Sequence, residues 1–210
     1  MTLQLISQAA LLADLRQRLN AEEPLLIAGL GDSLTYGWMV SRGFFDRFID
    51  KLKSEFPRCP ITAINAGIPG DTALGGLGRL SNLLDKKPAV VIVQFGLNDM
   101  YQGISKASFQ ATLDKIVKRL LSFSVIPILV TSCPLNWDEG QRLAEEFYDA
   151  IRDTAKANDV PCASLDRRWL ESAGPPNKWS KLVQCDNVHP TDAGHQLMAD
   201  GLLRFMFAPL

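Results

Sequence analysis

Five residues in this sequence have the types that acyl transfer requires: Ser33, Gly67, Asn98, Asp186 and His189. The reaction needs a nucleophile, a base that accepts its proton, a group that orients the base, and hydrogen-bond donors for the oxyanion. Serine, histidine and aspartate can supply the first three functions, and glycine and asparagine can supply the donors. Each residue alone is ordinary in a turn, so the prediction depends on whether the fold places all five at one site.

Short apolar segments precede these residues and alternate with longer segments in which apolar residues recur at helical spacing. Apolar runs of this length predict buried strands, and the recurrent pattern predicts amphipathic helices. The expected strands are 25–30, 61–65, 89–95, 126–131 and 162–165, and the expected helices cover the first twenty residues and the regions 44–56, 73–84, 109–121, 143–151 and 191–207. The longest stretch without clear periodicity is 166–189, and loops of that length are usually functional or disordered.

Strands that are apolar on both faces and alternate with helices predict an α/β fold of three layers (α/β/α), in which a five-stranded parallel sheet lies between helices. Right-handed crossover connections favour the flavodoxin-like strand order 2-1-3-4-5. Ligands of such sheets bind beyond the carboxyl ends of the strands. All five candidate residues follow predicted strands, so we expect them together at this rim of the sheet.

The length and composition indicate one domain of ordinary size. The chain has 210 residues, of which 47% are hydrophobic and 21% are charged, as is usual for a globular protein. We expect a single domain over residues 1–210, in which residues 1–20 form an N-terminal helical extension. The 22 basic and 23 acidic residues give a net charge of −1, so no basic excess favours binding to nucleic acid.

Membrane insertion, a metal site and an organic cofactor are not expected. No apolar run approaches the roughly 18 residues that a spanning helix needs. The four cysteines, Cys59, Cys133, Cys162 and Cys185, lack the C-x-x-C and histidine spacing of a zinc site. The N-terminal residues lack the basic and apolar regions of a signal peptide, so the expected location is the cytoplasm. The sequence does not indicate the oligomeric state.

Four short motifs follow one another along the chain: GDSLTYGW at 31–38, NAGIPG at 65–70, GLND at 96–99 and DNVHP at 186–190. Their residues and their order resemble the four sequence blocks of the SGNH hydrolases, also called GDSL-type esterases and lipases. The resemblance extends over nearly the whole chain apart from the N-terminal helix. It implies a three-layer hydrolase that cleaves carboxylic esters through an acyl-enzyme, with no metal or other cofactor.

The resemblance implies a role for each residue of a catalytic triad. Ser33 would be the nucleophile, His189 its general base, and Asp186 the acceptor of a hydrogen bond from the Nδ1 of His189. Ser33 is expected where a strand gives way to a helix, so that its hydroxyl is exposed at the rim. Pro190 is suited to the first position of a helix, which would place His189 at a helix N-terminus.

The resemblance also implies an oxyanion hole formed by the backbone N–H groups of Ser33 and Gly67 and by the side-chain amide of Asn98. Gly67 suits this role because substrate can approach a backbone that lacks a Cβ. Asn98 suits it because an amide donates hydrogen bonds without adding a charge to the site.

Several aromatic residues lie on the expected rim loops and could line an acyl or alcohol pocket. Trp38, Tyr101 and Trp137 are the predicted substrate-binding residues. Trp169 and Trp179 are also candidates, and some of these aromatic rings are expected to belong to the core instead.

Three rival motifs can be tested directly against the sequence. The elbow of the α/β-hydrolases, G-x-S-x-G, is not matched because Thr35 occupies its last position. The dinucleotide fingerprint G-x-G-x-x-G fits from Gly29 onward except that Leu34 replaces its third glycine. No P-loop motif is present. Four other polar residues are expected to have structural roles in turns, helix caps or the core: Asp32, Asp71, Asp99 and His195.

Two classes of function are therefore compared. The first is a serine hydrolase that acts on small-molecule carboxylic esters, with thioesterase or lysophospholipase activity as alternatives. Modest intervals between the motifs argue against a large lid, and an open site favours short, acetyl-type acyl groups. The second class is a flavodoxin-like module that binds a small ligand at the same rim without chemistry. Such a module would not need a base with its own orienting carboxylate, so the first class is favoured.

Overall fold

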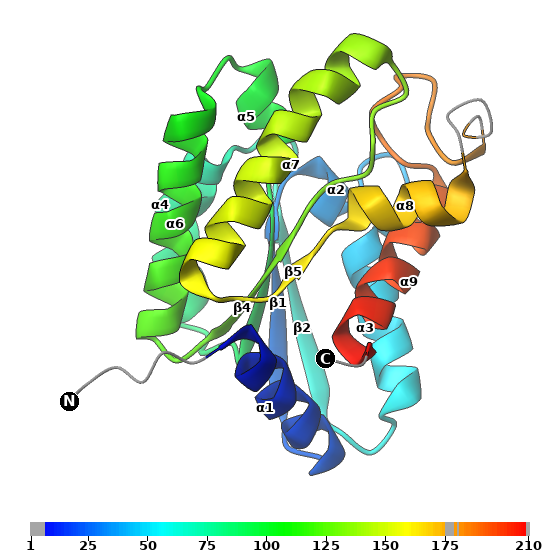
Figure 1. Ribbon diagram of the computed structural model, residues 1–210. Helices are drawn as coiled ribbons and strands as arrows, with labels where there is room; N and C mark the ends of the chain where they lie inside the picture. The colour runs from blue at the N-terminus through cyan, green and yellow to red at the C-terminus, as the bar shows by residue number, and fades with distance from the viewer. Residues whose placement is uncertain (1–6, 175–178, 180, 209–210) are drawn as a thin grey trace.

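The computed structural model of the chain describes residues 7–174, 179 and 181–208 (Figure 1). Its centre is a parallel sheet with the strand order β2-β1-β3-β4-β5, as predicted. The strands are β1 (Leu25–Gly31), β2 (Ile61–Gly67), β3 (Val90–Gln94), β4 (Ile126–Val130) and β5 (Cys162–Ala163). The fifth strand is shorter than expected because Leu165 begins a helix.

The register of the central strands brings three strand ends to the same level. Gly31 at the end of β1 pairs with Gly67 at the end of β2 and with Gln94 at the end of β3. Every residue of β3 and β4 is buried, as expected for strands that are covered on both faces. The polar segments that follow these strands therefore emerge side by side at one rim of the sheet.

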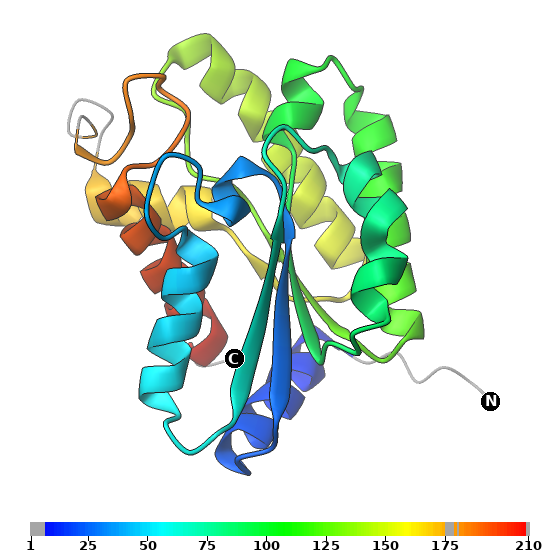
Figure 2. The ribbon, with the colours of Figure 1, turned by 180° about the vertical axis from the view of Figure 1, so that it is seen from behind.

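Helices cover both faces of the sheet, which confirms the expected three layers. The long helices are α1 (Gln8–Asn20), α3 (Phe44–Glu55), α4 (Ala73–Leu84), α6 (Lys106–Ser122), α7 (Asp138–Asn158) and α9 (Asp192–Phe207). Helices α4, α6 and α7 pack in sequence on one face, whereas α3 and α9 pair on the other (Figures 1 and 2).

Local sequence signals determine where these helices begin and which face they bury. Thr72, Ser105 and Thr191 cap α4, α6 and α9, because each side chain accepts a hydrogen bond from the backbone N–H three residues later. In α3, Phe44 and Phe48 are one helical turn apart and fully buried. This spacing gives the helix one apolar face that packs into the core.

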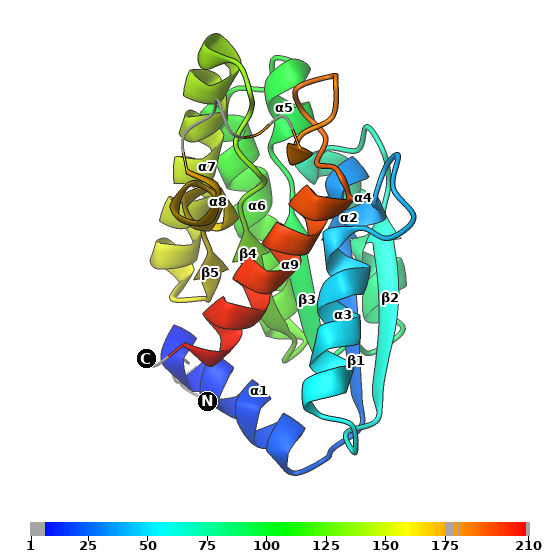
Figure 3. The same cartoon turned by 90° about the vertical axis from the view of Figure 1, so that its right-hand side faces the viewer.

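Helix α1 crosses the amino ends of the strands, at the opposite end of the sheet from the candidate residues (Figure 3). Leu15 and Leu19 on its inner face are buried. Arg16 donates hydrogen bonds to the backbone oxygens of Met206 and Ala208, both at 2.7 Å, and so attaches α1 to the end of α9. The helix predicted over the first twenty residues is thus observed from Gln8, while residues 1–6 lie outside the described part.

Periodicity does not predict three shorter helices: α2 (Ser33–Tyr36), α5 (Leu97–Tyr101) and α8 (Leu165–Ala173). Helix α8 occupies the start of the stretch 166–189 that lacks clear periodicity, of which residues 175–178 and 180 lie outside the described part. Trp169 on α8 is buried and packs edge-on against Trp179, with ring centroids 6.1 Å apart. These two tryptophans therefore belong to the core. Helices of one or two turns contain too few residues for a period to be detected.

Candidate active site

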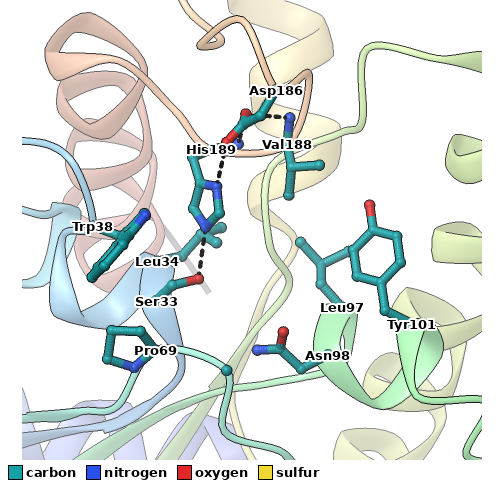
Figure 4. A pocket seen from close by; sticks show the side chains of 11 residues that line it. Ser33, Leu34, Trp38, Pro69, Leu97, Asn98, Tyr101, Asp186, Val188 and His189 are labelled. Atoms are coloured by element: carbon teal, nitrogen blue, oxygen red, sulfur yellow. Dashed lines mark hydrogen bonds and ion pairs between the residues drawn. The ribbon is translucent and has the colours of Figure 1, made fainter.

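The side chains of Ser33, His189 and Asp186 form a continuous chain of hydrogen bonds (Figure 4). The Oγ of Ser33 lies 2.9 Å from the Nε2 of His189, and the Nδ1 of His189 lies 2.7 Å from the Oδ2 of Asp186. With a proton on Nδ1, the Nε2 atom is free to accept the proton of Ser33. The structure thus brings together a nucleophile, a base and an orienting carboxylate from opposite ends of the chain.

The short segment 186–189 holds its own carboxylate in place. The Oδ1 of Asp186 accepts hydrogen bonds from the backbone N–H groups of Val188 and His189, both at 2.9 Å. Partial burial raises the pKa of Asp186, but these N–H donors and the imidazole outweigh burial, so the pKa lies below its usual value. Asp186 is therefore ionised at neutral pH and can stabilise a protonated His189.

His189 does not lie at a helix N-terminus, contrary to the expectation from Pro190. Pro190 instead forms an isolated antiparallel bridge with Val183, and Thr191 is the N-cap of α9. The helix begins later than the proline because the Thr191 side chain can accept the hydrogen bond that a cap requires. The backbone of His189 is consequently held by a strand-like bridge.

Ser33 is the first residue of α2 and follows β1 after a single residue. Asp32 caps α2 by accepting a hydrogen bond from the N–H of Leu34 at 2.9 Å, and its other oxygen accepts from the Nε2 of Gln94 at 3.1 Å. The hydroxyl of Thr35 donates to the Oε1 of Gln94 at 2.8 Å. Gln94, at the end of β3, thus holds the turn that presents the Ser33 hydroxyl.

The other polar residues that were expected to be structural have structural partners. Burial raises the pKa of Asp32 to about 7 and that of Asp99 to about 6. The carboxylate of Asp99 accepts from the N–H of Ala73 at the start of α4. The Nδ1 of His195 accepts from the N–H of Phe44 at 3.0 Å, which joins α9 to α3. This buried histidine agrees with the predicted structural role.

Asn98 reaches the site from α5, on the far side of the cavity from Trp38 (Figure 4). Gly96, with a φ of 127°, turns the chain from β3 into α5. One Nδ2 proton of Asn98 donates to the backbone oxygen of Asp71 at 3.0 Å. The amide nitrogen carries a second proton, and among the described residues no other acceptor for it is found.

The structure does not bring Gly67 to the cavity. Its N–H donates to the Oδ1 of Asn65 at 3.0 Å. An added Cβ on Gly67 would lie 2.3 Å from the backbone nitrogen of Tyr36. The missing Cβ therefore permits close packing of β2 against α2, and the sequence argument that it admits substrate is wrong for this residue.

Gly70, three residues later, is better placed to supply a donor. It lines the cavity, its φ of 80° favours glycine, and no atom lies within 4 Å of an added Cβ. Within the described residues, the N–H of Gly70 donates no hydrogen bond to the protein. The signal for this residue in the sequence is the pair Pro69-Gly70, which marks a turn with a positive φ at the glycine.

A cavity of about 370 Å³ opens beside Ser33. Its lining residues are Ser33, Leu34, Trp38, Pro69, Gly70, Leu97, Asn98, Tyr101, Asp186, Val188 and His189. The aromatic side chains of Trp38 and Tyr101 are 44% and 48% exposed and stand on opposite sides of the cavity (Figure 4). Their role in substrate binding stays a prediction.

Trp137, the third aromatic residue predicted to bind substrate, is not part of this lining. It is the residue before α7, and its ring lies against Gly140, where an added Cβ would come within 2.2 Å of the ring. The indole therefore packs on the first turn of α7 and lies beside the side chain of Tyr101, which does line the cavity. The sequence could place Trp137 on a rim loop but could not predict the direction of its side chain.

Comparison with known proteins places this geometry in a family. Residues 30–197 match the GDSL-like lipase/acylhydrolase family. The chain belongs to this family. The matched range contains the whole hydrogen-bonded chain from Ser33 to His189. The protein is therefore a GDSL-type hydrolase of carboxylic esters, as predicted, and small-molecule esters are its class of substrate.

Characterised relatives of this GDSL-type hydrolase resemble it over most of their length. Esterase TesA of Pseudomonas aeruginosa is 29% identical over 186 residues, which is 87% of each chain. Thioesterase 1/protease 1/lysophospholipase L1 of Escherichia coli (strain K12) is 30% identical over 191 residues, which is 89% of this chain and 85% of the relative. The crystal structure of Axe2, an acetylxylan esterase from Geobacillus stearothermophilus, has a TM-score of 0.77 at 19% identity and covers 88% of this chain and 95% of its own. This likeness confirms the fold.

Two further observations concern the described residues only. No group of three or more histidine, cysteine, aspartate or glutamate side chains among them is arranged to hold a metal ion. No helix within this part of the chain is both long enough and apolar enough to cross a membrane.

Proposed function

We propose that the protein cleaves its esters through an acyl-enzyme intermediate on Ser33. The observation that carries this proposal is the distance of 2.9 Å between the Ser33 Oγ and the His189 Nε2, together with the contact of 2.7 Å between His189 and Asp186. The hydroxyl oxygen attacks the ester carbonyl while its proton moves to Nε2. Asp186 keeps the proton of Nδ1 in place and stabilises the imidazolium that forms.

The tetrahedral intermediate then breaks down in two stages. The bond between the carbonyl carbon and the alcohol oxygen breaks, and the Nε2 of His189 returns its proton to the departing alcohol. A water molecule next gives a proton to His189 and attacks the acyl group on Ser33. Release of the carboxylic acid returns the hydroxyl proton to Ser33, so the enzyme ends as it began.

The proposed oxyanion hole consists of the Ser33 N–H, the Gly70 N–H and the free Nδ2 proton of Asn98. Gly70 replaces Gly67 in this proposal because only Gly70 lines the cavity. Fixed donors of this kind stabilise the charge that develops on the carbonyl oxygen, and they need no reorganisation during the reaction.

We propose a preference for short, uncharged acyl esters. The cavity is shallow enough to leave Trp38 and Tyr101 half exposed, and of the described residues that line it none is a lysine or arginine. A phosphate in the substrate would therefore find no positively charged partner in the cavity. The relatives include an arylesterase and an acetylxylan esterase, which agree with this preference, whereas the thioesterase and lysophospholipase names represent the alternatives.

The test is hydrolysis of p-nitrophenyl esters from acetate to palmitate by the wild type and by Ser33→Ala. We expect activity that decreases with chain length and that is abolished in Ser33→Ala, and a fluorophosphonate should label only the wild type. The control is Ser122→Ala, an exposed serine at the end of α6. Activity retained in Ser33→Ala would contradict the mechanism, and an optimum at long chains would contradict the preference. Faster cleavage of a thioester than of the matching ester would favour thioesterase activity.

The cytoplasmic location and the single-domain organisation over residues 1–210 remain proposals. All four cysteines are free, which is typical of a reducing compartment. The buried apolar residues form one core that spans the sheet and the helices on both sides, which supports one domain. Fractionation of native cells tests the location.

A further inference from the structure

Arg79 on α4 donates hydrogen bonds to three acceptors close to the candidate active site. Its Nη1 donates to the backbone oxygen of Ala66 at 2.6 Å, its Nη2 to that of Gly31 at 3.0 Å, and its Nε to the Oδ2 of Asp71 at 2.9 Å. We propose that Arg79 is the positioning residue of the oxyanion hole. This inference rests on the proposed function, because it assumes that the donors at the cavity act on a tetrahedral intermediate.

The three acceptors lie on the two chain segments that carry Ser33 and Gly70. Gly31 precedes Ser33 by two residues at the end of β1. Asp71 follows Gly70 directly, and Ala66 is the last residue but one of β2, just before the loop that leads to Gly70. The backbone oxygen of Asp71 also accepts the hydrogen bond from Asn98 that fixes the amide on α5. One guanidinium therefore joins the segments of Ser33 and Gly70 directly, and it reaches Asn98 indirectly through Asp71.

The chemistry of these contacts requires an arginine. Three acceptors that converge on one side chain match the planar fork of a guanidinium, whereas a lysine ammonium cannot reach them in the same geometry. The side chains of Arg79 and Asp71 are only 21% and 14% exposed, so water competes weakly for the contact. The Gly31 oxygen accepts the hydrogen bond from Arg79 in addition to one from the N–H of Ile68 at 3.0 Å.

The backbone around Asp71 is adapted to this arrangement. An added Cβ on Gly75, one turn further along α4, would lie 1.8 Å from the Oδ1 of Asp71. Thr72 donates its N–H to the same oxygen at 3.0 Å and caps α4 through its side chain. Helix α4 is thus attached to the loop at both Thr72 and Arg79, so the loop cannot move independently of the helix.

Loss of the guanidinium should therefore act on catalysis more than on binding. A misplacement of about 1 Å among catalytic groups can lower a rate by about 10²-fold. We expect Arg79→Ala to lower kcat by about 10²-fold, with KM changed less than about threefold, because the donors act mainly on the transition state. Arg79→Lys keeps the charge but not the fork, and we expect kcat to fall by about 10-fold.

The experiment measures kcat, KM and the melting temperature of both variants with p-nitrophenyl acetate, in the absence and presence of millimolar guanidinium chloride. Added guanidinium should occupy the space left in Arg79→Ala and restore kcat at least several-fold. It should not affect the wild type or Arg79→Lys. The matched control is Arg16→Met, which removes an arginine that donates to two backbone oxygens far from the site. This control should lower the melting temperature and leave kcat unchanged.

Two results would overturn the inference. One is a kcat of Arg79→Ala within about threefold of the wild type, and the other is a loss of kcat that added guanidinium does not restore. If Arg79→Ala does not fold, Arg79→Lys decides the question, and an unchanged kcat in that variant overturns the inference. Activity retained in Ser33→Ala would instead contradict the proposed function, so the two failures can be distinguished.

Discussion

Asn98 lines the cavity together with Ser33 and Gly70, and one of its two amide protons holds the backbone oxygen of Asp71. The proposed mechanism uses the second proton as a donor to the oxyanion. A side chain that is already fixed by one hydrogen bond loses little freedom when it forms the second, so it can act as a preorganised donor. The same separation of tasks applies to Asp186, whose Oδ1 holds its own turn while its Oδ2 contacts His189.

We expect Asn98→Ala to lower kcat by about 10²- to 10³-fold, because one donor to the oxyanion is lost. The value of KM should change little. Steady-state kinetics on a short p-nitrophenyl ester provides the measurement, and Asn158→Ala, which removes a structural asparagine at the end of α7, is the control. A decrease in kcat below about threefold would show that Asn98 does not stabilise the transition state.

At the scale of elements, the site depends on how closely α2 approaches the end of β2. Gly67 lies against the backbone of Tyr36 in α2, and Gly37 ends the helix with a φ of 86°. The helix has only four residues, so its own hydrogen bonds contribute little to its position. Its position is set by contacts with β2 and by the hydrogen bonds of Asp32 and Thr35 to Gln94.

Gly67→Ala should therefore displace α2 and with it the nucleophile. The new Cβ would meet backbone atoms of Tyr36, which cannot move aside as a flexible side chain can. We expect a loss of about 1–3 kcal/mol in the free energy of unfolding and a lower kcat. Denaturant unfolding and kinetics measure the two effects. Gly78→Ala in α4 is the control, since no atom lies near its added Cβ, and it should stabilise the protein by about 0.5–1 kcal/mol. Equal changes in stability and in kcat for Gly67→Ala and Gly78→Ala would contradict this account.

At the scale of the whole molecule, His195 links the two helices that cover one face of the sheet. It is fully buried on α9 and accepts the N–H of Phe44 at the start of α3. Burial, with smaller effects from the charges of Arg47 and His189, lowers its pKa to about 3. The folded protein thus excludes a proton that the unfolded chain binds below about pH 6.5.

This difference in proton binding should lower stability in acid. Between about pH 6.5 and 3 the unfolded state holds more protons at His195, so its contribution to the free energy of unfolding decreases as the pH falls. Asp32, with its pKa raised to about 7, has the opposite effect between pH 7 and its ordinary value, because its folded form binds the extra proton. The two effects offset each other in the wild type.

His195→Asn should remove the contribution of His195 to the pH dependence of stability, because asparagine can still accept the Phe44 N–H but does not titrate. From pH 6.5 to 4.5, the stability of the variant relative to the wild type should rise by roughly 2–3 kcal/mol. Urea unfolding at both pH values measures the change. If the free energies of unfolding of the two proteins change in parallel with pH, His195 does not cause the loss of stability in acid.

Much of the molecule follows from local patterns in the sequence. The strands, their order and the long helices were predictable, and so was the proximity of Ser33, Asp186 and His189, the proposed triad. Amphipathic helices require apolar residues at helical spacing, and buried strands require short apolar runs, so both can be recognised in the sequence. A parallel sheet brings the residues that follow its strands to one rim. Within the triad, Asp186 and His189 are also close in sequence, so a single turn determines their contact.

The tertiary structure alone decided which rim residues face the cavity. Gly70 rather than Gly67 lines it, Trp137 packs onto Gly140, and Pro190 joins a bridge. Arg79 connects the end of β1 to the end of β2 and to the loop that follows β2. None of these outcomes has a periodic signal, because the direction of a loop side chain depends on contacts with segments that are distant in the sequence. The sequence by itself therefore determined the class of reaction and the sheet and helices around the site. The packing of α2, α4 and α5 against the strand ends decided which groups line the cavity.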